Sequence, residues 1–156
     1  MLFFAVKYLH LIGAAVLLGT GAGIACFMVM AHQSGEAPVV ASVGRIVVAA
    51  DFVFTATAVV AQPITGVALA ALDGYSLREG WIALTIGLYL IAGAFWLPVV
   101  SMQIRMRDLA ADAARSGASL PPRYHRLYRT WFAFGFPAFG AVLAIYWLML
   151  TRPDLP

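Results

Sequence analysis

The chain has few charged residues and no long polar stretch. Only 11% of its residues are charged, whereas roughly a quarter are charged in soluble globular proteins. Hydrophobic residues make up 63% of the 156 positions, and the mean hydropathy is strongly positive. This composition predicts an integral membrane protein and argues against a soluble enzyme. Any chemistry is therefore expected between membrane helices or in a single loop.

Two types of metal-binding residue are also scarce. Cys26 is the single cysteine, so no intrachain disulfide framework or cluster of paired thiolates is expected. We expect Cys26 to be a small buried apolar residue. The chain has three histidines, of which His10 alone lies inside an apolar run. A haem held by two histidines of one membrane bundle is therefore excluded.

Long apolar runs are the main feature that is present. They cover residues 8–30, 46–71, 81–104 and 131–151. A helix needs about 20 apolar residues to cross the hydrocarbon core of a bilayer. The sequence therefore predicts an all-α fold, a single four-helix transmembrane domain with up-down topology over residues 1–156. We expect the third helix to continue beyond the membrane to about Arg115, where Ser116-Gly117 ends it.

The basic residues predict the orientation. With four spans, the first and third loops share one side, which would carry Arg45, Arg105, Arg107, Arg115, Arg123, Arg126 and Arg129. The other side would carry only Lys7, Arg78 and Arg152. Because basic loops stay in the cytoplasm, we expect a bacterial inner-membrane protein with both termini on the periplasmic face. Trp131 would lie near the inner boundary. The arginine-rich third loop would meet anionic inner-leaflet lipids, and topology explains these charges without nucleic acid.

The second apolar run contains a polar stripe. Asp51, Thr55, Ala58, Gln62 and Thr65 follow the spacing of one helix face. Such a stripe is expected to face the bundle interior, because unsatisfied polar groups are costly in lipid. The simplest partner for Asp51 would be Arg45 or another arginine on the cytoplasmic side. Alternatively, the threonines bond to their own helix, and Gln62 repairs a backbone kinked by Pro63.

The antiparallel order of the spans predicts a pocket in the outer half of the bundle. Its expected residues are His10, Gly13, Gln62, Thr65 and Met149. Such a pocket would suit a haem edge or a quinone-like ring, with His10 as the iron ligand or as a hydrogen-bond donor and Gly13 leaving room. A haem would need a second ligand, such as Met149 at similar depth or a side chain of a partner, or it would keep an open position. The alternative is that His10 is only an interfacial hydrogen-bonding residue.

Several motifs together carry a family resemblance. They are Tyr8-Leu9-His10, the basic third loop, and Tyr124-His125-Arg126-Leu127-Tyr128-Arg129 before a last span that ends in Thr151-Arg152-Pro153. In this layout the chain resembles a group of small, uncharacterised four-helix bacterial membrane proteins. It is also distantly similar to the HemJ type of protoporphyrinogen oxidase and to the membrane domain of the CopD copper-resistance proteins.

The resemblance implies haem b as a cofactor, since HemJ-like proteins have a proposed haem ligand at the position of His10. Those proteins also carry a lysine after the tryptophan-leucine of the third span, where this chain has Pro98. The missing lysine argues against the oxidase activity. The CopD resemblance implies copper handling, for which His10, Cys26 and Met149 are acceptable ligands.

Three classes of function stay open at this point. The first is a redox protein that binds haem b or a quinone-like ring. The second is a non-catalytic accessory or assembly subunit, within a homo-oligomer or a larger membrane complex. The third is a small transporter that uses the polar stripe or handles copper. Whether the chain is an enzyme is left open by the sequence.

Overall fold

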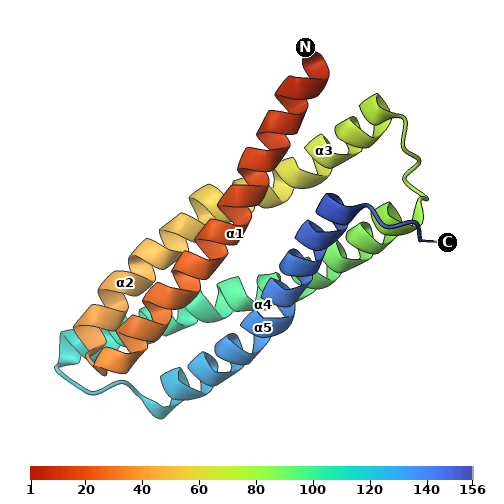
Figure 1. Cartoon of the computed structure of the whole chain (residues 1–156). Coiled ribbons are helices and arrows are strands. Elements are labelled where there is room, and N and C mark those ends of the chain that lie inside the picture. Colours follow the sequence, from red (N-terminus) through yellow and green to blue (C-terminus); the bar gives the residue numbers. More distant parts are fainter. Residues whose placement is uncertain (156) are drawn as a thin grey trace.

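The computed structural model describes residues 1–155 and consists of long helices joined by short loops. They are α1 (Leu2–Ser34), α2 (Ala37–Ala50), α3 (Ala56–Asp73), α4 (Gly80–Ser116) and α5 (Pro122–Thr151). A π-helical turn, η1 (Asp51–Thr55), joins α2 to α3 in one continuous rod. Four rods of the described chain are thus long and apolar enough to cross a membrane, which confirms the predicted all-α fold (Figure 1).

Glycine ends three of the rods. Gly35, Gly74 and Gly117 have φ angles of 69°, 77° and 65°, in the left-handed region that glycine adopts without a steric penalty. The predicted apolar runs lie inside these helices. The third rod continues to Ser116, as the sequence predicts. Since the rise is about 1.5 Å per residue, a 33-residue helix such as α1 is longer than the hydrocarbon core is thick.

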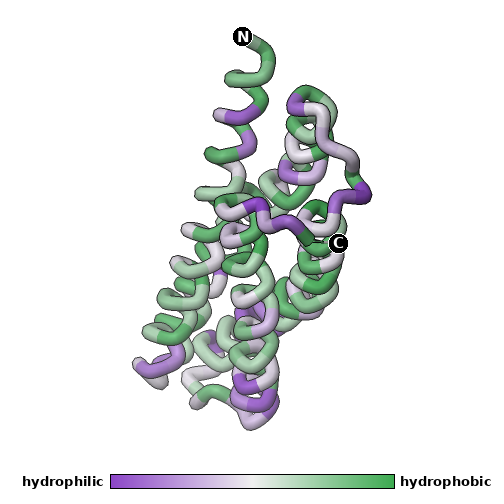
Figure 2. The backbone as a smooth tube through the Cα atoms, turned by 45° about the vertical axis from the view of Figure 1, so that its right-hand side comes forward, coloured by the Kyte–Doolittle hydropathy of each residue, from purple (hydrophilic) through white to green (hydrophobic). Residues whose placement is uncertain are grey.

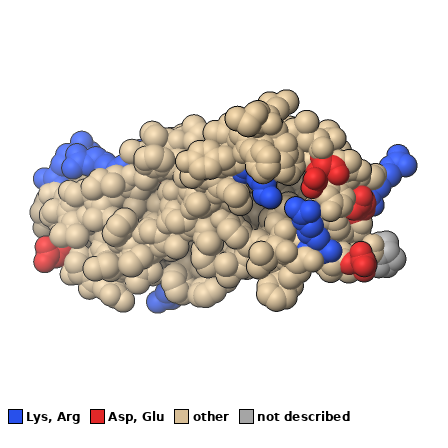
Figure 3. Space-filling view, turned by 45° about the horizontal axis from the view of Figure 1, so that its top comes forward, with Lys and Arg blue, Asp and Glu red and all other residues tan. Residues whose placement is uncertain are grey.

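The rods alternate in direction, so the molecule has two distinct ends (Figure 1). We call the end with both chain termini and the connection between α3 and α4 the terminal end. We call the other end, with the turns after Ser34 and Ser116, the loop end. Figure 2 shows hydrophobic residues along the rods and hydrophilic ones gathered mainly near the two ends. Figure 3 shows the same pattern for charge, with charged side chains mostly toward the ends of the molecule.

The core lies in the half of the bundle near the loop end. Its most deeply buried residues are Met28 of α1, Val40 and Val47 of α2, Met106 of α4 and Tyr124 of α5. Tyr124 Oη lies 3.3 Å from His32 Nδ1, and the His32 ring stacks on Tyr128. These contacts attach the last turn of α1 to the first turns of α5.

Toward the terminal end the bundle separates into two helix pairs. There α3 packs mainly against α1, while α4 packs along α5, and Figure 1 shows the two pairs diverging. Large apolar side chains such as Leu90 and Phe136 point outward, as expected for a surface that contacts lipid. The sequence prediction for Cys26 is wrong, because its side chain is exposed on α1 instead of buried.

Candidate functional site

His10 contacts α3 through its imidazole ring. Its Nδ1 lies 2.8 Å from the Thr65 hydroxyl oxygen. The same hydroxyl lies 2.8 Å from the Ala61 carbonyl oxygen, and the Gln62 carbonyl lies 3.2 Å away. A threonine hydroxyl has one hydrogen. We assign that hydrogen to the α3 backbone, so that Thr65 Oγ1 accepts a hydrogen bond from His10 Nδ1.

This assignment gives the neutral imidazole one protonation pattern. With the hydrogen on Nδ1, Nε2 carries the lone pair. Among residues 1–155, Nε2 makes no hydrogen bond of its own, and the buried side-chain atoms without a partner belong to Thr55 and Tyr146 only. His10 Nε2 is therefore accessible from outside the protein. A ring that donates through one nitrogen and leaves the other free has the arrangement typical of metal-ligating histidines.

Gln62 and two glycines complete the contact between α1 and α3. Gln62 Nε2 donates a hydrogen bond of 2.9 Å to the backbone carbonyl of His10. The same amide occupies the space over Gly13, where a Cβ atom would collide with it. At Gly66, a Cβ atom would lie 3.4 Å from His10 Cε1. We call these five residues the His10 site: His10, Gly13, Gln62, Thr65 and Gly66.

Four of the five residues predicted for the outer pocket thus lie in contact. His10 and Gln62 touch directly, and side chains fill the space between α1 and α3 at this level. Met149 lies on α5 with 36% of its surface exposed. Among the described residues, the hydrogen-bond partners of His10 and the atoms nearest Gly13 and Gly66 all belong to α1 or α3. Met149 is not among these hydrogen-bond partners, and its place as a second ligand stays a prediction.

A second polar cluster surrounds Asp51 in η1. Asp51 is only 3% exposed, and Trp96 Nε1 of α4 donates to its Oδ1 at 3.4 Å. When the Gln103 amide is oriented to satisfy its neighbours, its nitrogen donates to Asp51 Oδ2 at 2.7 Å and its oxygen accepts from Trp131 Nε1 at 3.3 Å. Asp51, Trp96, Gln103 and Trp131 form what we call the Asp51 network. Its hydrogen bonds join the second rod to α4 and α5, and all the donors are uncharged side chains.

The structure corrects the expected partner of Asp51. Asp51 is in none of the ion pairs between described residues, and Arg45 is exposed. Arg45 precedes Asp51 by six residues, which puts the two on different faces of the helix. Thr55, one turn on from Asp51, has a buried hydroxyl without a hydrogen bond of normal geometry to residues 1–155. The π-helical turn lies at this cluster, and such turns are frequent at functional sites.

The comparison with protein families matches residues 4–153 to a family described as predicted integral membrane protein (DUF2269). The match covers nearly the whole chain. The chain belongs to the DUF2269 family. None of the curated proteins matches it, and none of the solved structures does. The family description agrees with the four apolar rods of the structure. For this DUF2269 chain, the similarity to the HemJ type and to CopD stays an expectation from the sequence.

The partners of Asp51 are the residues that sequence reasoning about this DUF2269 protein missed. Trp131 is expected near the inner boundary, with no partner named; it is 5% exposed and bonds to Gln103. Gln103 lies at the end of the predicted third span, also with no partner named, and it is 2% exposed. The sequence did contain a signal that Gln103 is buried. It shares one helix face with Met102 and Met106, and an apolar face of this kind usually packs against another helix.

Proposed function

We propose that this DUF2269 protein is a membrane redox protein in which His10 provides the axial ligand to a haem iron. The observation that carries the proposal is the hydrogen bond from His10 Nδ1 to Thr65, which leaves the Nε2 lone pair accessible. Thr65 is itself fixed by the α3 backbone. Ligand orientation by such a second residue is the usual support of a metal-binding histidine.

The same protonation pattern favours iron over the carbonyl oxygen of a quinone. A quinone oxygen accepts hydrogen bonds, so it needs an N–H donor. His10 Nδ1–H is already used by Thr65, and Nε2 carries a lone pair. A metal ion needs that lone pair. When bound, haem supplies one-electron chemistry, with a potential set by its axial ligands and its surroundings.

The residues around His10 would each have a defined task. Thr65 holds the imidazole in one orientation, and Gln62 fixes the backbone of α1 at His10. Gly66 leaves the His10 Cε1 edge close to the α3 backbone. His10 is the residue of this chain that would hold the iron. A second ligand would come from Met149 or from a partner protein, or there would be none.

The experiment is an absorption spectrum of protein purified from cells that are supplied with a haem precursor. We expect a Soret band that His10→Ala abolishes. His125→Ala is the matched control, because His125 is an exposed histidine at the loop end, and its band should be unchanged. Wild-type protein without haem, or a band that survives His10→Ala, would refute the proposal. Stable co-purification of haem-free protein with other membrane proteins would instead favour the accessory-subunit function.

The Asp51 network supports a second candidate function, the transfer of protons or small monovalent cations. The observation behind it is a buried carboxylate that no described cation pairs with, since ionisable groups inside membrane helices commonly mark ion or proton pathways. In proteoliposomes with an internal pH dye, Asp51→Asn should abolish the proton flux. Asp108→Asn, which changes an exposed aspartate, should not. Equal flux in empty vesicles and in vesicles with wild-type protein would contradict this candidate.

We also propose that the loop end faces the cytoplasm of a bacterial inner membrane. The support is the distribution of basic residues, seven of which lie on the spans and loops of that side in the predicted topology. In this orientation, the arginines near the loop end would meet the anionic headgroups of the inner leaflet. His10 would then lie in the periplasmic half of the bilayer.

A further inference from the structure

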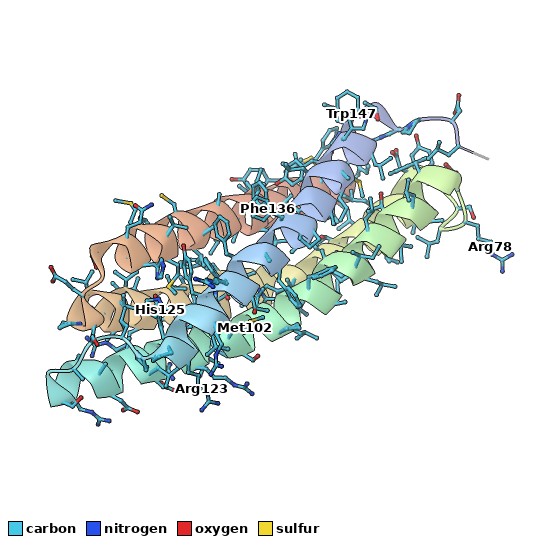
Figure 4. The ribbon with its side chains drawn as sticks, turned by 90° about the horizontal axis from the view of Figure 1, so that it is seen from below. Arg78, Met102, Arg123, His125, Phe136 and Trp147 are labelled. Atoms are coloured by element: carbon cyan, nitrogen blue, oxygen red, sulfur yellow. The ribbon has the colours of Figure 1, made fainter. Side chains whose placement is uncertain are left out.

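A groove lined by three arginines opens at the surface between α4 and α5. Arg105 of α4 and Arg123 and Arg126 of α5 line it. Met102, Leu127 and Thr130 complete its wall, and its volume is about 340 Å³. Figure 4 shows Met102 and Arg123 near one another on these two helices, far from Trp147 at the terminal end. We call this feature the arginine groove.

The positive charge of the arginine groove is not compensated within the described chain. The ion pairs among the described residues join Arg107 to Asp108, Arg115 to Asp112, and, at the terminal end, Arg152 to Asp73. The two aspartates nearest in sequence to Arg105 are thus paired with other arginines. Three guanidinium groups around one hollow repel one another, and an anion bound between them would relieve the repulsion. Guanidinium groups suit phosphate especially, because they donate two parallel hydrogen bonds to its oxygens.

The surroundings of the groove point to a phosphate that carries an apolar chain. Met102 and Leu127 are apolar parts of its wall. From the groove toward the terminal end, α4 presents exposed apolar residues on the same helix face, such as Ile91, which precedes Met102 by eleven residues and is 48% exposed. Phe95 and Phe134 join the two helices there by an edge contact. A free phosphate ion would use only the arginines, whereas a phospholipid would use both parts of this surface.

We propose that the arginine groove is a binding site for the headgroup phosphate of an anionic phospholipid. The inference assigns the lipid contact proposed for the loop end to three residues: Arg105, Arg123 and Arg126. This inference rests on the proposed function in one respect: the loop end must lie at a membrane surface. It does not depend on haem, because the His10 site is formed by α1 and α3 toward the terminal end.

The test measures lipid binding to detergent-purified full-length protein by native mass spectrometry. Phosphatidylglycerol is the probe, and phosphatidylcholine is the zwitterionic comparison. The groove variant carries Arg105→Gln, Arg123→Gln and Arg126→Gln. The matched control carries Arg45→Gln, Arg115→Gln and Arg129→Gln, which remove the same charge from exposed positions outside the groove. Circular dichroism verifies that both variants stay helical, and the single variant Arg123→Gln replaces the triple variant if that one unfolds.

We expect wild-type protein to retain phosphatidylglycerol in preference to phosphatidylcholine. The groove variant should lose about tenfold or more in affinity, because hydrogen bonds to charged groups are among the stronger ones, while the control variant should lose little. An equal loss in both variants would mean that lipid binding depends only on the total positive charge, and it would overturn the site. Equal binding by all three proteins would overturn it as well. Displacement of the lipid by inorganic phosphate at the same concentration would show that the apolar wall contributes nothing, and it would overturn the lipid proposal.

Discussion

At the scale of single residues, Gly13 marks the closest approach of α1 and α3. The Gln62 amide lies where the Cβ atom of any other residue would be, and it is held there by its hydrogen bond to the His10 carbonyl. The amide cannot move away without breaking that bond. Gly19 and Gly21, on the same helix, have open space at this position. The glycines of α1 are therefore not equivalent, although the sequence alone gives them similar surroundings.

We predict that Gly13→Ala destabilises the protein, because the new methyl group displaces the Gln62 amide. Overpacking of this kind costs about 1–3 kcal/mol. Gly21→Ala is the matched control and should leave the free energy of unfolding unchanged or slightly higher, since alanine is the better helix former. Denaturation of the detergent-solubilised protein, followed by circular dichroism, measures both variants. Equal stability of the two would contradict the close contact at Gly13.

Gln103 carries the second prediction at this scale. Replacing it with leucine removes the donor to Asp51 Oδ2 and the acceptor for Trp131 Nε1. Trp131 then has no partner, and Asp51 keeps only the bond from Trp96 to its other oxygen. Each unsatisfied group costs about 1–3 kcal/mol. We therefore expect Gln103→Leu to lower the unfolding midpoint clearly, whereas Gln33→Leu, at an exposed position, should not. Tryptophan fluorescence is a second measurement, because the Trp131 indole loses its partner. An unchanged midpoint would show that the network does not stabilise the bundle.

The sequence could predict part of these contacts and not the rest. His10, Gln62 and Thr65 were placed at similar depth because antiparallel helices run past one another at 1.5 Å per residue. That calculation works for helices that pack directly against each other, such as α1 and α3. For Met149 it stays a prediction, because the depth of α5 relative to α1 depends on tilt, which packing determines. It fails for Trp96, Gln103 and Trp131, whose meeting with Asp51 depends on the rotation of α4 and α5.

At the scale of helices and turns, η1 changes the direction of side chains along the second rod. A π-helical turn accommodates one more residue per turn than an α-helix, so it rotates α3 relative to α2. Asp51 consequently bonds to α4, while Gln62 and Thr65 bond to α1. The sequence indicated one stripe over this region, but nothing in it indicated the turn that divides the stripe between two partners.

The contact between α2 and α4 gives a prediction for these elements. A Cβ atom at Gly44 would lie 3.1 Å from Arg107 Cβ, slightly below the ~3.8 Å typical of disulfides. We predict that the double variant Gly44→Cys and Arg107→Cys, combined with Cys26→Ala, forms an intramolecular disulfide on oxidation. In the control pair Arg105→Cys replaces Arg107→Cys. Because Arg105 faces the arginine groove, this pair should stay reduced. Intact mass and thiol labelling distinguish the outcomes, and cross-linking of both pairs would contradict the observed helix rotation.

At the scale of the whole molecule, the two ends of the bundle differ in packing. The buried core lies near the loop end, where α1, α2, α4 and α5 meet. Near the terminal end, the α1–α3 pair diverges from the α4–α5 pair (Figure 1). Arg152 still connects the two pairs there, since it lies 3.6 Å from Asp73 and donates to the Tyr75 hydroxyl. The His10 site thus belongs to the more loosely packed half, and the arginine groove to the half that contains the buried core.

The orientation in the membrane gives the last prediction. The chain has ten lysines and arginines, and seven belong to the side of the loop end in the predicted topology, with Lys7, Arg78 and Arg152 on the other. The fold adds that both termini lie at one end (Figure 1), so one reporter at the C-terminus decides the side of both. Alkaline phosphatase fused after Asp154 should be active, because it folds only in the periplasm. A fusion in the turn after Gly117 should be inactive there, and green fluorescent protein at the same two positions should give the reverse result. An inactive phosphatase at the C-terminus, combined with a fluorescent protein there, would invert the orientation and place the arginine groove at the outer surface.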